Sequence, residues 1–363
     1  MMKLRRWTRN QKKVALILIA AGFLSLVLVI MPVATVVVYE SVFSRRIEPA
    51  SWLEFDVADF EGLSVEPCTF ESNDGQRLAG YHYEKGDSSV NGVVILVHGF
   101  GCGGQNSFMP LADFFTSNGY LVFSYDATAN GNSEGNSVNG LPQGVADLDY
   151  ALRYVKSEKR YANLPILLLG HSWGAYSAGA VLNLHCDVSA AVLVSGPNSS
   201  LDMMLSESKR IAGPLVYPGV PYLMLYERLK FGKYSEYSVL DGFASSDAEI
   251  LVVHSMDDAA VPPEIGYNKF YERYQDDSRF EFVSYSNRGH DRIFYSLSAE
   301  QYRDRLNSDY LQYVEENALT HDAETKEAFF DQYPDVSLCF ELDPALMEQI
   351  LETYNDCCEV HNE

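Results

Sequence analysis

The most informative stretch of the sequence, residues 165–179, runs Pro-Ile-Leu-Leu-Leu-Gly-His-Ser-Trp-Gly-Ala-Tyr-Ser-Ala-Gly. Its apolar run between a proline and a glycine predicts a buried central strand of a parallel sheet, and the small residues that follow predict a tightly packed helix. Between them, Ser172 occupies a sharp turn, where a Cβ at Gly170 or Gly174 would collide with a neighbouring element. Ser172 is therefore the candidate nucleophile. The alternative is an ordinary serine in a glycine-rich strand-to-helix connection.

A serine nucleophile needs a base, a carboxylate that orients the base, and donors for the oxyanion. His290 follows the strand predicted at 279–285, while Asp257 and Asp258 follow the strand predicted at 249–255. Because loops after parallel strands share one edge of a sheet, we expect these residues beside Ser172. Either aspartate would also suit a cap for the helix expected to begin at Pro262.

The chain resembles the α/β-hydrolase superfamily over roughly residues 65–317. His98-Gly99-Phe100-Gly101 looks like the family's oxyanion loop. Residues 125–135 resemble its Asp-x-x-Gly-x-Gly-x-Ser-x-Gly segment, with Ala129 and Asn130 in place of the usual Gly and His.

This resemblance implies roles for three further residues. The oxyanion donors would be the backbone amides of Phe100 and Trp173. The acid would be Asp258, because the family's Gly-x-x-Asp-x-x-Val-Pro pattern falls on residues 255–262, with Ser255 in place of the glycine. We expect His98 and His171 to support turns through hydrogen bonds and Cys102 to be a small packing residue.

Strands and helices alternate along the chain, which predicts a doubly wound, mostly parallel sheet. An antiparallel hairpin at 65–85 should form one edge of the sheet. Residues 198–247, rich in Tyr, Leu, Met and Pro, are too many for a simple connection and predict a cap over Ser172. Five cap residues are either core or lining of an acyl-binding cleft: Met203, Met204, Tyr222, Met224 and Tyr226.

The first forty residues predict a membrane anchor. Residues 14–39 carry no charge, and at about 1.5 Å per residue they exceed a hydrocarbon core of roughly 30 Å. Pro32 predicts a kink, because the carbonyl it frees can be satisfied locally. Six basic residues precede the run, so the N-terminus should be cytoplasmic and the catalytic domain extracytoplasmic, in a single-pass protein of the cell membrane. The alternative is a cleaved signal peptide. Signal peptides have a shorter apolar segment than this one, and cleavage after Ala34 would require a small residue at position 32, where the chain has Pro32.

The amino-acid composition limits the classes of partner that the protein can bind. Without the six basic residues of the arm, the chain has 21 Lys and Arg and 50 Asp and Glu, which gives a net charge of −29. Nucleic acid is excluded as a partner, because phosphate binding needs a basic surface. The 6 cysteines are widely spread and show neither a disulfide framework nor metal-ligand spacing. We expect no metal and no cofactor. The expected substrate is a small or lipid-like acyl compound, and the sequence leaves the oligomeric state open.

The predicted organisation is a basic arm (1–13), an anchor (14–39), a linker (40–64), a hydrolase domain (65–318) and an acidic helical extension (319–363). In the linker, Trp52, Phe55 and Phe60 either pack on the domain or lie at the membrane interface. Deletion of residues 1–45 is expected to release a soluble, active enzyme. The leading function is a serine hydrolase of carboxylic esters; the alternatives are a peptidase or amide hydrolase with the same triad, and a non-catalytic binding protein.

Overall fold

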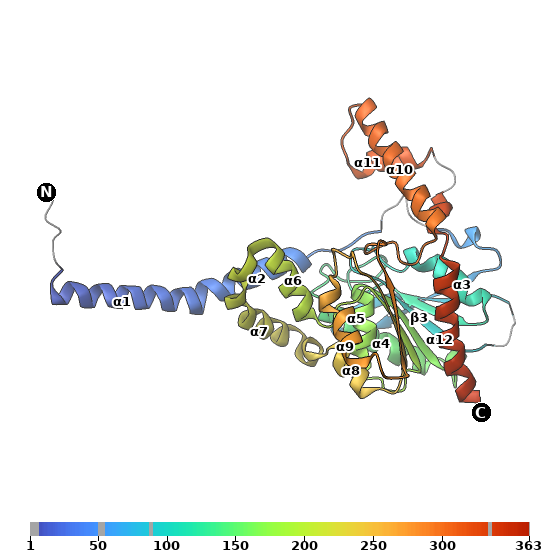
Figure 1. Ribbon diagram of the computed structural model, residues 1–363, viewed down its shortest axis with the longest axis horizontal. Coiled ribbons are helices and arrows are strands. Elements are labelled where there is room, and N and C mark those ends of the chain that lie inside the picture. The colour runs from blue at the N-terminus through green and yellow to red at the C-terminus, as the bar shows by residue number, and fades with distance from the viewer. Residues whose placement is uncertain (1–6, 50–54, 87–89, 333–335, 363) are drawn as a thin grey trace.

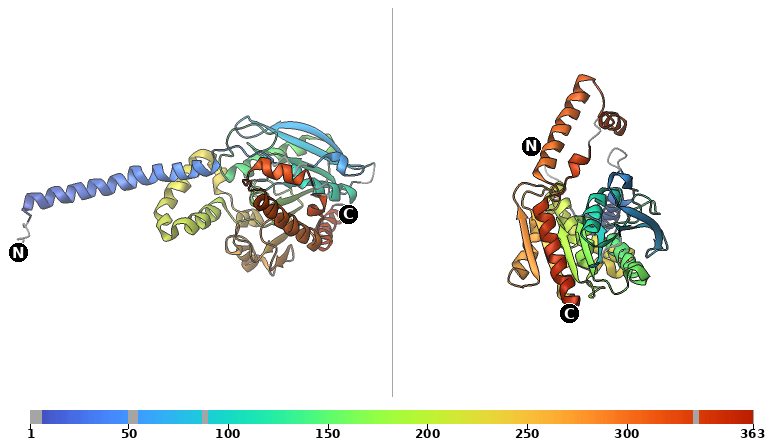
Figure 2. Two further views of the ribbon diagram at one scale, coloured as in Figure 1. Left: turned by 90° about the horizontal axis from the view of Figure 1, so that it is seen from above. Right: turned by 90° about the vertical axis from the view of Figure 1, so that its right-hand side faces the viewer.

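The computed structural model describes residues 7–49, 55–86, 90–332 and 336–362 of this chain. A long N-terminal helix projects from an α/β domain, and a small group of helices lies beside its inner end (Figure 1). The turned view in Figure 2 shows the same helix leaving the domain. Trp52 and the first three basic residues, Lys3, Arg5 and Arg6, lie outside the described residues.

One sheet of 8 strands forms the centre of the domain, in the order β1-β2-β4-β3-β5-β6-β7-β8. The edge hairpin of β1 and β2 pairs antiparallel with β4, and the remaining pairs are parallel. This arrangement confirms the predicted fold class. The strands are β1 Ser64–Glu71, β2 Arg77–Glu84, β3 Val93–Val97, β4 Leu121–Tyr125, β5 Ile166–His171, β6 Ala190–Val194, β7 Glu249–Ser255 and β8 Phe280–Tyr285.

Helices cover both faces of the sheet because the central strands are apolar on both sides. Val93, Ile95 and Val97 of β3 face one core, and Val94 and Leu96 face the other. The first core is closed by α4 (Pro142–Ser157), α5 (Trp173–Val181), α8 (Val239–Ser245) and α9 (Tyr267–Tyr274), and the second by α3 (Met109–Ser117) and α12 (Pro344–Asn362), as Figure 1 shows.

The C-terminal helix belongs to the domain, which corrects the predicted boundary at residue 318. Leu346, Met347 and Ile350 of α12 are buried against the sheet, and the Tyr354 hydroxyl donates to the carbonyl of Leu168 on β5 (2.7 Å). The acidic residues of α12 made it look like a solvated appendage, but its apolar stripe completes the second core. Of the helices that follow β8, α10 (Leu297–Glu316) and α11 (Ala323–Phe330) project away from the body in Figure 1, whereas α12 packs on it.

The N-terminal helix runs without interruption through α1 (Arg9–Ser25), the π-helical turn η1 (Leu26–Ile30) and α2 (Met31–Phe43). It is long and apolar enough to cross a membrane. Its last two turns are part of the domain, because Tyr39 and Phe43 are 1% and 2% exposed in the first core.

The segment after this helix is joined to the domain, so the predicted linker is not a free one. Arg46 donates to the backbone carbonyls of Gly131, Ser133 and Gly135, and Ile47 pairs with Asn130. Further along, Phe55 lies against Phe60 and Phe340, with ring centroids 5.6 and 4.8 Å apart. For both phenylalanines this favours packing on the domain over the membrane interface.

The cap comprises α6 (Ser200–Ala212), η6 (Gly213–Gly219), α7 (Val220–Phe231) and η7 (Gly232–Glu236). The predicted insertion also contained α8, but Val239 and Phe243 of α8 are fully buried in the first core. The cap is bonded to the N-terminal helix: Tyr226 and Lys230 both donate to Glu40 (2.5 and 2.6 Å), and Tyr39 donates to Glu227 (3.1 Å).

Candidate active site

Ser172 lies in the turn between β5 and α5, at the carboxyl edge of the sheet. Its backbone adopts φ 56° and ψ −115°, a region that side chains rarely occupy. The flanking glycines permit this turn, because a Cβ at Gly174 would lie 2.0 Å from the carbonyl oxygen of Val97 and one at Gly170 would lie 2.3 Å from that of Gly174. The Ser172 amide donates to Val194 on β6 (2.8 Å), which fixes the turn against the next strand.

His290 and Asp258 meet Ser172 in a continuous row of hydrogen bonds. Nε2 of His290 lies 2.9 Å from Oγ of Ser172, and its Nδ1 lies 2.8 Å from Oδ2 of Asp258. The other carboxylate oxygen of Asp258 accepts from the amides of Ala260 and Val261 (2.9 and 2.8 Å). Burial is the largest single influence and opposes ionisation of Asp258, but the hydrogen bond and charge of His290 and the Val261 amide together outweigh it. The pKa of this carboxyl therefore lies below its usual value.

Asp257, the neighbouring candidate, faces away from the imidazole. Its carboxylate accepts from the Ser255 hydroxyl (2.5 Å) and the Gly289 amide (3.0 Å). Asp257 therefore ties the loop that carries His290 to the end of β7, while Asp258 contacts His290 directly.

Phe100 and Trp173, the two residues whose amides were expected to face the oxyanion, lie side by side. Their ring centroids are 5.9 Å apart in an edge-to-face arrangement. Trp173 is the first residue of α5, so its amide has no partner within the helix and lies at the positive end of the helix dipole.

His98 and His171, the two histidines that flank Ser172 in the sequence analysis, support the backbone. His98 contacts the Gly99 carbonyl (2.9 Å) through Nδ1 and accepts from the Ala127 amide (3.0 Å) through Nε2. His171 lies 2.9 Å from the carbonyl oxygen of His290 through Nε2, and burial lowers the pKa of His171 to about 4. Both rings therefore position loops, as expected from the sequence.

Cys102 also behaves as a packing residue. Burial raises the pKa of its thiol to about 11, so it remains protonated and unreactive near neutral pH.

The five cap residues that the sequence suggested as lining of an acyl-binding cleft lie in different environments. Met203 and Met204 pack against the first core, whereas Met224 is exposed and lines a cavity of about 410 Å³ on the cap. Tyr222 and Tyr226 bond to the N-terminal helix, so the structure assigns their hydroxyls to holding the cap and not to lining a cleft.

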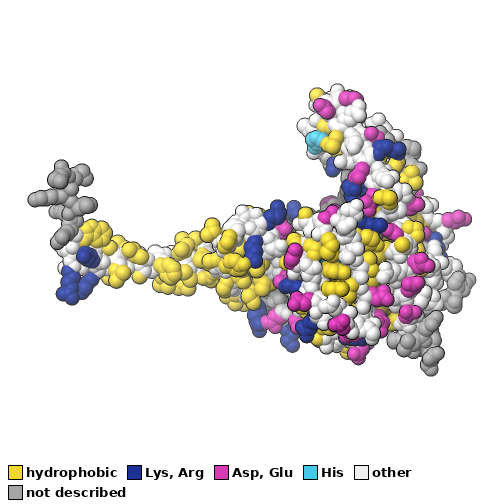
Figure 3. Space-filling model, viewed as in Figure 1, with side chains coloured by type: hydrophobic (Ala, Val, Ile, Leu, Met, Phe, Trp, Pro, Cys, Tyr) yellow, Lys and Arg dark blue, Asp and Glu magenta, His cyan; other side chains and the backbone are white. Residues whose placement is uncertain are grey.

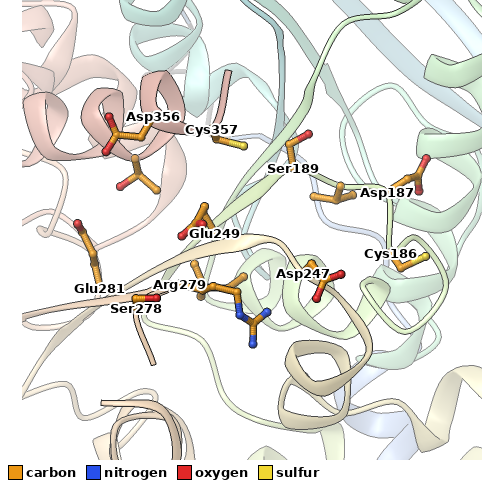
Figure 4. Close-up of a pocket in the computed structure, with 13 residues that line it drawn as sticks. Cys186, Asp187, Ser189, Asp247, Glu249, Ser278, Arg279, Glu281, Asp356 and Cys357 are labelled. Atoms are coloured by element: carbon orange, nitrogen blue, oxygen red, sulfur yellow. The ribbon is translucent and has the colours of Figure 1, made fainter. Parts of the chain in front are cut away.

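Two further cavities lie in the domain. One, of about 290 Å³, is lined by Cys102, His171 and Phe294 and adjoins the Ser172 row. The other, of about 490 Å³, lies at the opposite end of the parallel strands, where Asp247, Glu249, Arg279 and Asp356 surround it (Figure 4). It contains none of the residues of the Ser172 row.

His171, His290 and Asp291 lie close enough together to suggest a cation site, with ligand atoms within 4.8 Å of one another. The donor set does not fit a resident metal. Both ring nitrogens of His290 already face Ser172 and Asp258, and Nε2 of His171 contacts a backbone carbonyl.

Tyr39 and Phe43 also contribute to this region, which the sequence pattern did not predict. The Phe43 ring lies edge-to-face on Phe100 (5.8 Å) and beside Tyr39 (4.7 Å), so the end of the N-terminal helix supports the loop that carries Phe100. Aromatic residues at the end of an apolar helix equally indicate a membrane-interface belt, so the pattern alone gave no signal for this packing.

Comparison with known proteins links this geometry to hydrolases. The chain matches the sequence model of the family described as serine aminopeptidase, S33, over residues 88–239. It is 31% identical to a monoglyceride lipase of Saccharomyces cerevisiae over 131 residues, which is 34% of this chain and 40% of that protein. It is 29% identical to a caffeoylshikimate esterase of Arabidopsis thaliana over 116 residues, 31% of this chain and 35% of that protein.

The chain therefore spans at most 40% of the length of these curated relatives. Among solved structures, an esterase of Pyrococcus furiosus matches with a TM-score of 0.52 and 18% identity, covering 75% of this chain and 98% of that one. At this identity the likeness establishes the fold.

Proposed function

Because this chain has the fold of the α/β hydrolases, we propose that it is a serine hydrolase that cleaves a carboxylic ester through an acyl-enzyme intermediate. The observation that carries the proposal is the row from Ser172 Oγ through His290 to Asp258, with contacts of 2.9 and 2.8 Å. A nucleophile bonded to a base that is itself held by a buried carboxylate is the arrangement that this chemistry requires.

In the proposed reaction, Ser172 attacks the acyl carbon while His290 takes the hydroxyl proton on Nε2. His290 then gives this proton to the leaving alcohol, and a water molecule activated in the same way releases the acid. Asp258 holds Nδ1 of the imidazole and stabilises its positive charge. The amides of Trp173 and Phe100 would bind the oxyanion.

The names of two relatives, a monoglyceride lipase and a caffeoylshikimate esterase, support an ester substrate. The family description, serine aminopeptidase, supports amide hydrolysis as the second candidate. A small or lipid-like acyl compound fits the first, and an aminoacyl amide fits the second.

The proposed location is the cell membrane, with a single span in the helix Arg9–Phe43, a cytoplasmic N-terminus and an extracytoplasmic catalytic domain. Arg9, Lys12 and Lys13 lie before the uncharged part of this helix, which supports that orientation.

The test uses the full chain in detergent, with a fluorophosphonate probe and a panel of chromogenic esters beside aminoacyl anilides. We expect labelling and ester turnover in the wild type and neither in Ser172→Ala, whose melting temperature should match the wild type. Asp257→Asn provides a matched control in the same loops and should still be labelled. Preference for the anilides would replace the ester assignment by the amidase, and labelling of Ser172→Ala would overturn both.

A further inference from the structure

The cap carries an apolar face that is open to its surroundings. Leu215 and Leu229 are 85% and 77% exposed, and four further apolar side chains on the cap are also exposed: Ile211, Tyr217, Met224 and Leu225. In Figure 3 hydrophobic side chains continue from the N-terminal helix onto this end of the molecule. A continuous patch of this kind indicates an interaction surface, in contrast to single scattered residues.

A hydrogen bond joins the cap to the middle of the helix at Pro32. In η1 the Met31 amide donates to the carbonyl of Leu26, five residues back. With the same spacing, Val27 would accept from residue 32, but Pro32 has no amide hydrogen. The Tyr222 hydroxyl donates to this carbonyl of Val27 (2.7 Å). The cap therefore satisfies a carbonyl that would cost several kcal/mol if left unpaired in hydrocarbon.

The position of Val27 gives the depth of this contact. If the hydrocarbon core begins after Lys13 and is roughly 30 Å thick, about 20 residues cross it and the helix leaves it near Val33. Val27 precedes that point by six residues, so Tyr222 reaches up to about 9 Å below the surface. Amphipathic helices at membrane surfaces bury their apolar faces by about 5–10 Å.

The neighbouring contacts agree with a position at the membrane surface. A Cβ on Gly219 would lie 3.4 Å from Oγ1 of Thr35, so η6 runs close beside the helix. The Lys209 ammonium lies over the ring of Tyr217 (4.9 Å), an arrangement in which the stem covers apolar surface while the charge stays with water and headgroups.

We propose that the cap sits in the membrane interface, with its apolar face against lipid and Tyr222 completing the backbone hydrogen bonding of the span at Pro32. The proposal rests on the helix Arg9–Phe43 crossing a bilayer, and it is independent of the ester chemistry. The occupant of the apolar face is lipid, because the face is continuous with the helix that the bilayer surrounds. As a consequence, acyl substrates dissolved in the bilayer reach the cap without crossing water.

The experiment places a bimane fluorophore on single cysteines in the full chain, reconstituted in phosphatidylcholine vesicles that contain a nitroxide-labelled lipid. Cys186 is the exposed native cysteine, so Cys186→Ser serves as the background. Leu215→Cys probes the cap, and Leu297→Cys, 65% exposed at the start of α10, is the matched control. Leu18→Cys reports on the span itself.

We expect the nitroxide near the headgroup to quench the label at position 215 at least about threefold more than the label at 297, and iodide in the water to show the reverse order. Equal quenching at 215 and 297, with strong lipid quenching at 18, would overturn the cap proposal while leaving the span intact. Weak lipid quenching at position 18 would overturn the span and the cap proposal with it. Protection of position 215 from both quenchers would assign the face to a second copy and also refute the proposal.

Discussion

Phe43 provides a direct test of whether the N-terminal helix is part of the enzyme. Its side chain is 2% exposed and contacts the rings of Tyr39 and Phe100. Replacement of a buried phenylalanine by alanine costs about 3–5 kcal/mol, which is a large part of a typical stability of about 5–15 kcal/mol. At about 2–4 °C per kcal/mol, we expect Phe43→Ala to lower the melting temperature by roughly 6–20 °C.

The matched control is Val37→Ala on the same helix, where the side chain is 61% exposed and faces away from the domain. Both variants are purified as the full chain in detergent and melted by calorimetry, and turnover is measured below the transition. Because Phe43 supports Phe100, kcat should also fall in Phe43→Ala and not in Val37→Ala. Equal melting temperatures and equal kcat for the two variants would refute the packing argument.

This packing also corrects the expectation that deletion of residues 1–45 leaves an active enzyme. Such a deletion removes Tyr39 and Phe43 from the first core, and it leaves Glu227 without the Tyr39 hydroxyl. The shortened protein would expose Phe100 and the cap, so we expect it to be unstable.

Three further predictions concern the row of hydrogen bonds, the cap and the pH dependence of stability. Asp258→Asn should lower kcat by about a thousandfold or more and Asp257→Asn by less than about tenfold, measured on a soluble ester; the reverse order would assign the acid to Asp257. Tyr222→Phe should destabilise the reconstituted protein by about 1 kcal/mol and the exposed Tyr217→Phe by almost nothing, and equal melting curves would show that the Val27 carbonyl needs no partner. Burial lowers the pKa of His171 from 6.5 to about 4, so between these values the unfolded chain binds a proton that the folded chain excludes. The free energy of unfolding should therefore be at its full value above about pH 6.5 and fall as the pH drops toward 4. Urea unfolding across this range should show a shallower fall for His171→Asn, and an unchanged slope would contradict the assignment.

Much of the fold follows from local pattern. The strand at 249–255 has the predicted bounds, and the strand predicted at 279–285 begins one residue later, because apolar runs end there at clear turn signals. Errors occurred where these signals are weak. Gly266 interrupts the helix expected from Pro262, so the α-helix there begins only at Tyr267.

The residues of the candidate site were accessible to sequence reasoning because each follows a strand of one sheet. The choice of Asp258 over Asp257 came from a resemblance and not from the residues themselves, and the structure explains it by the direction in which each carboxylate points. The roles of α12 and of Tyr39 were not predictable, because an apolar stripe shows that a helix is covered and does not say by what.

The position of α12 has a consequence for how the protein is made. Tyr354 bonds to the strand that leads to Ser172, and it lies 186 residues further along the chain from its partner Leu168. Because α12 follows the strands, the cap and the N-terminal helix in the chain, it leaves the ribosome after all of them. Until α12 has emerged, the second face of the sheet is covered only in part, by α3, and the nascent chain exposes apolar surface there. A stop codon or a bulky fusion just before α12 would thus produce a chain that cannot complete its second core.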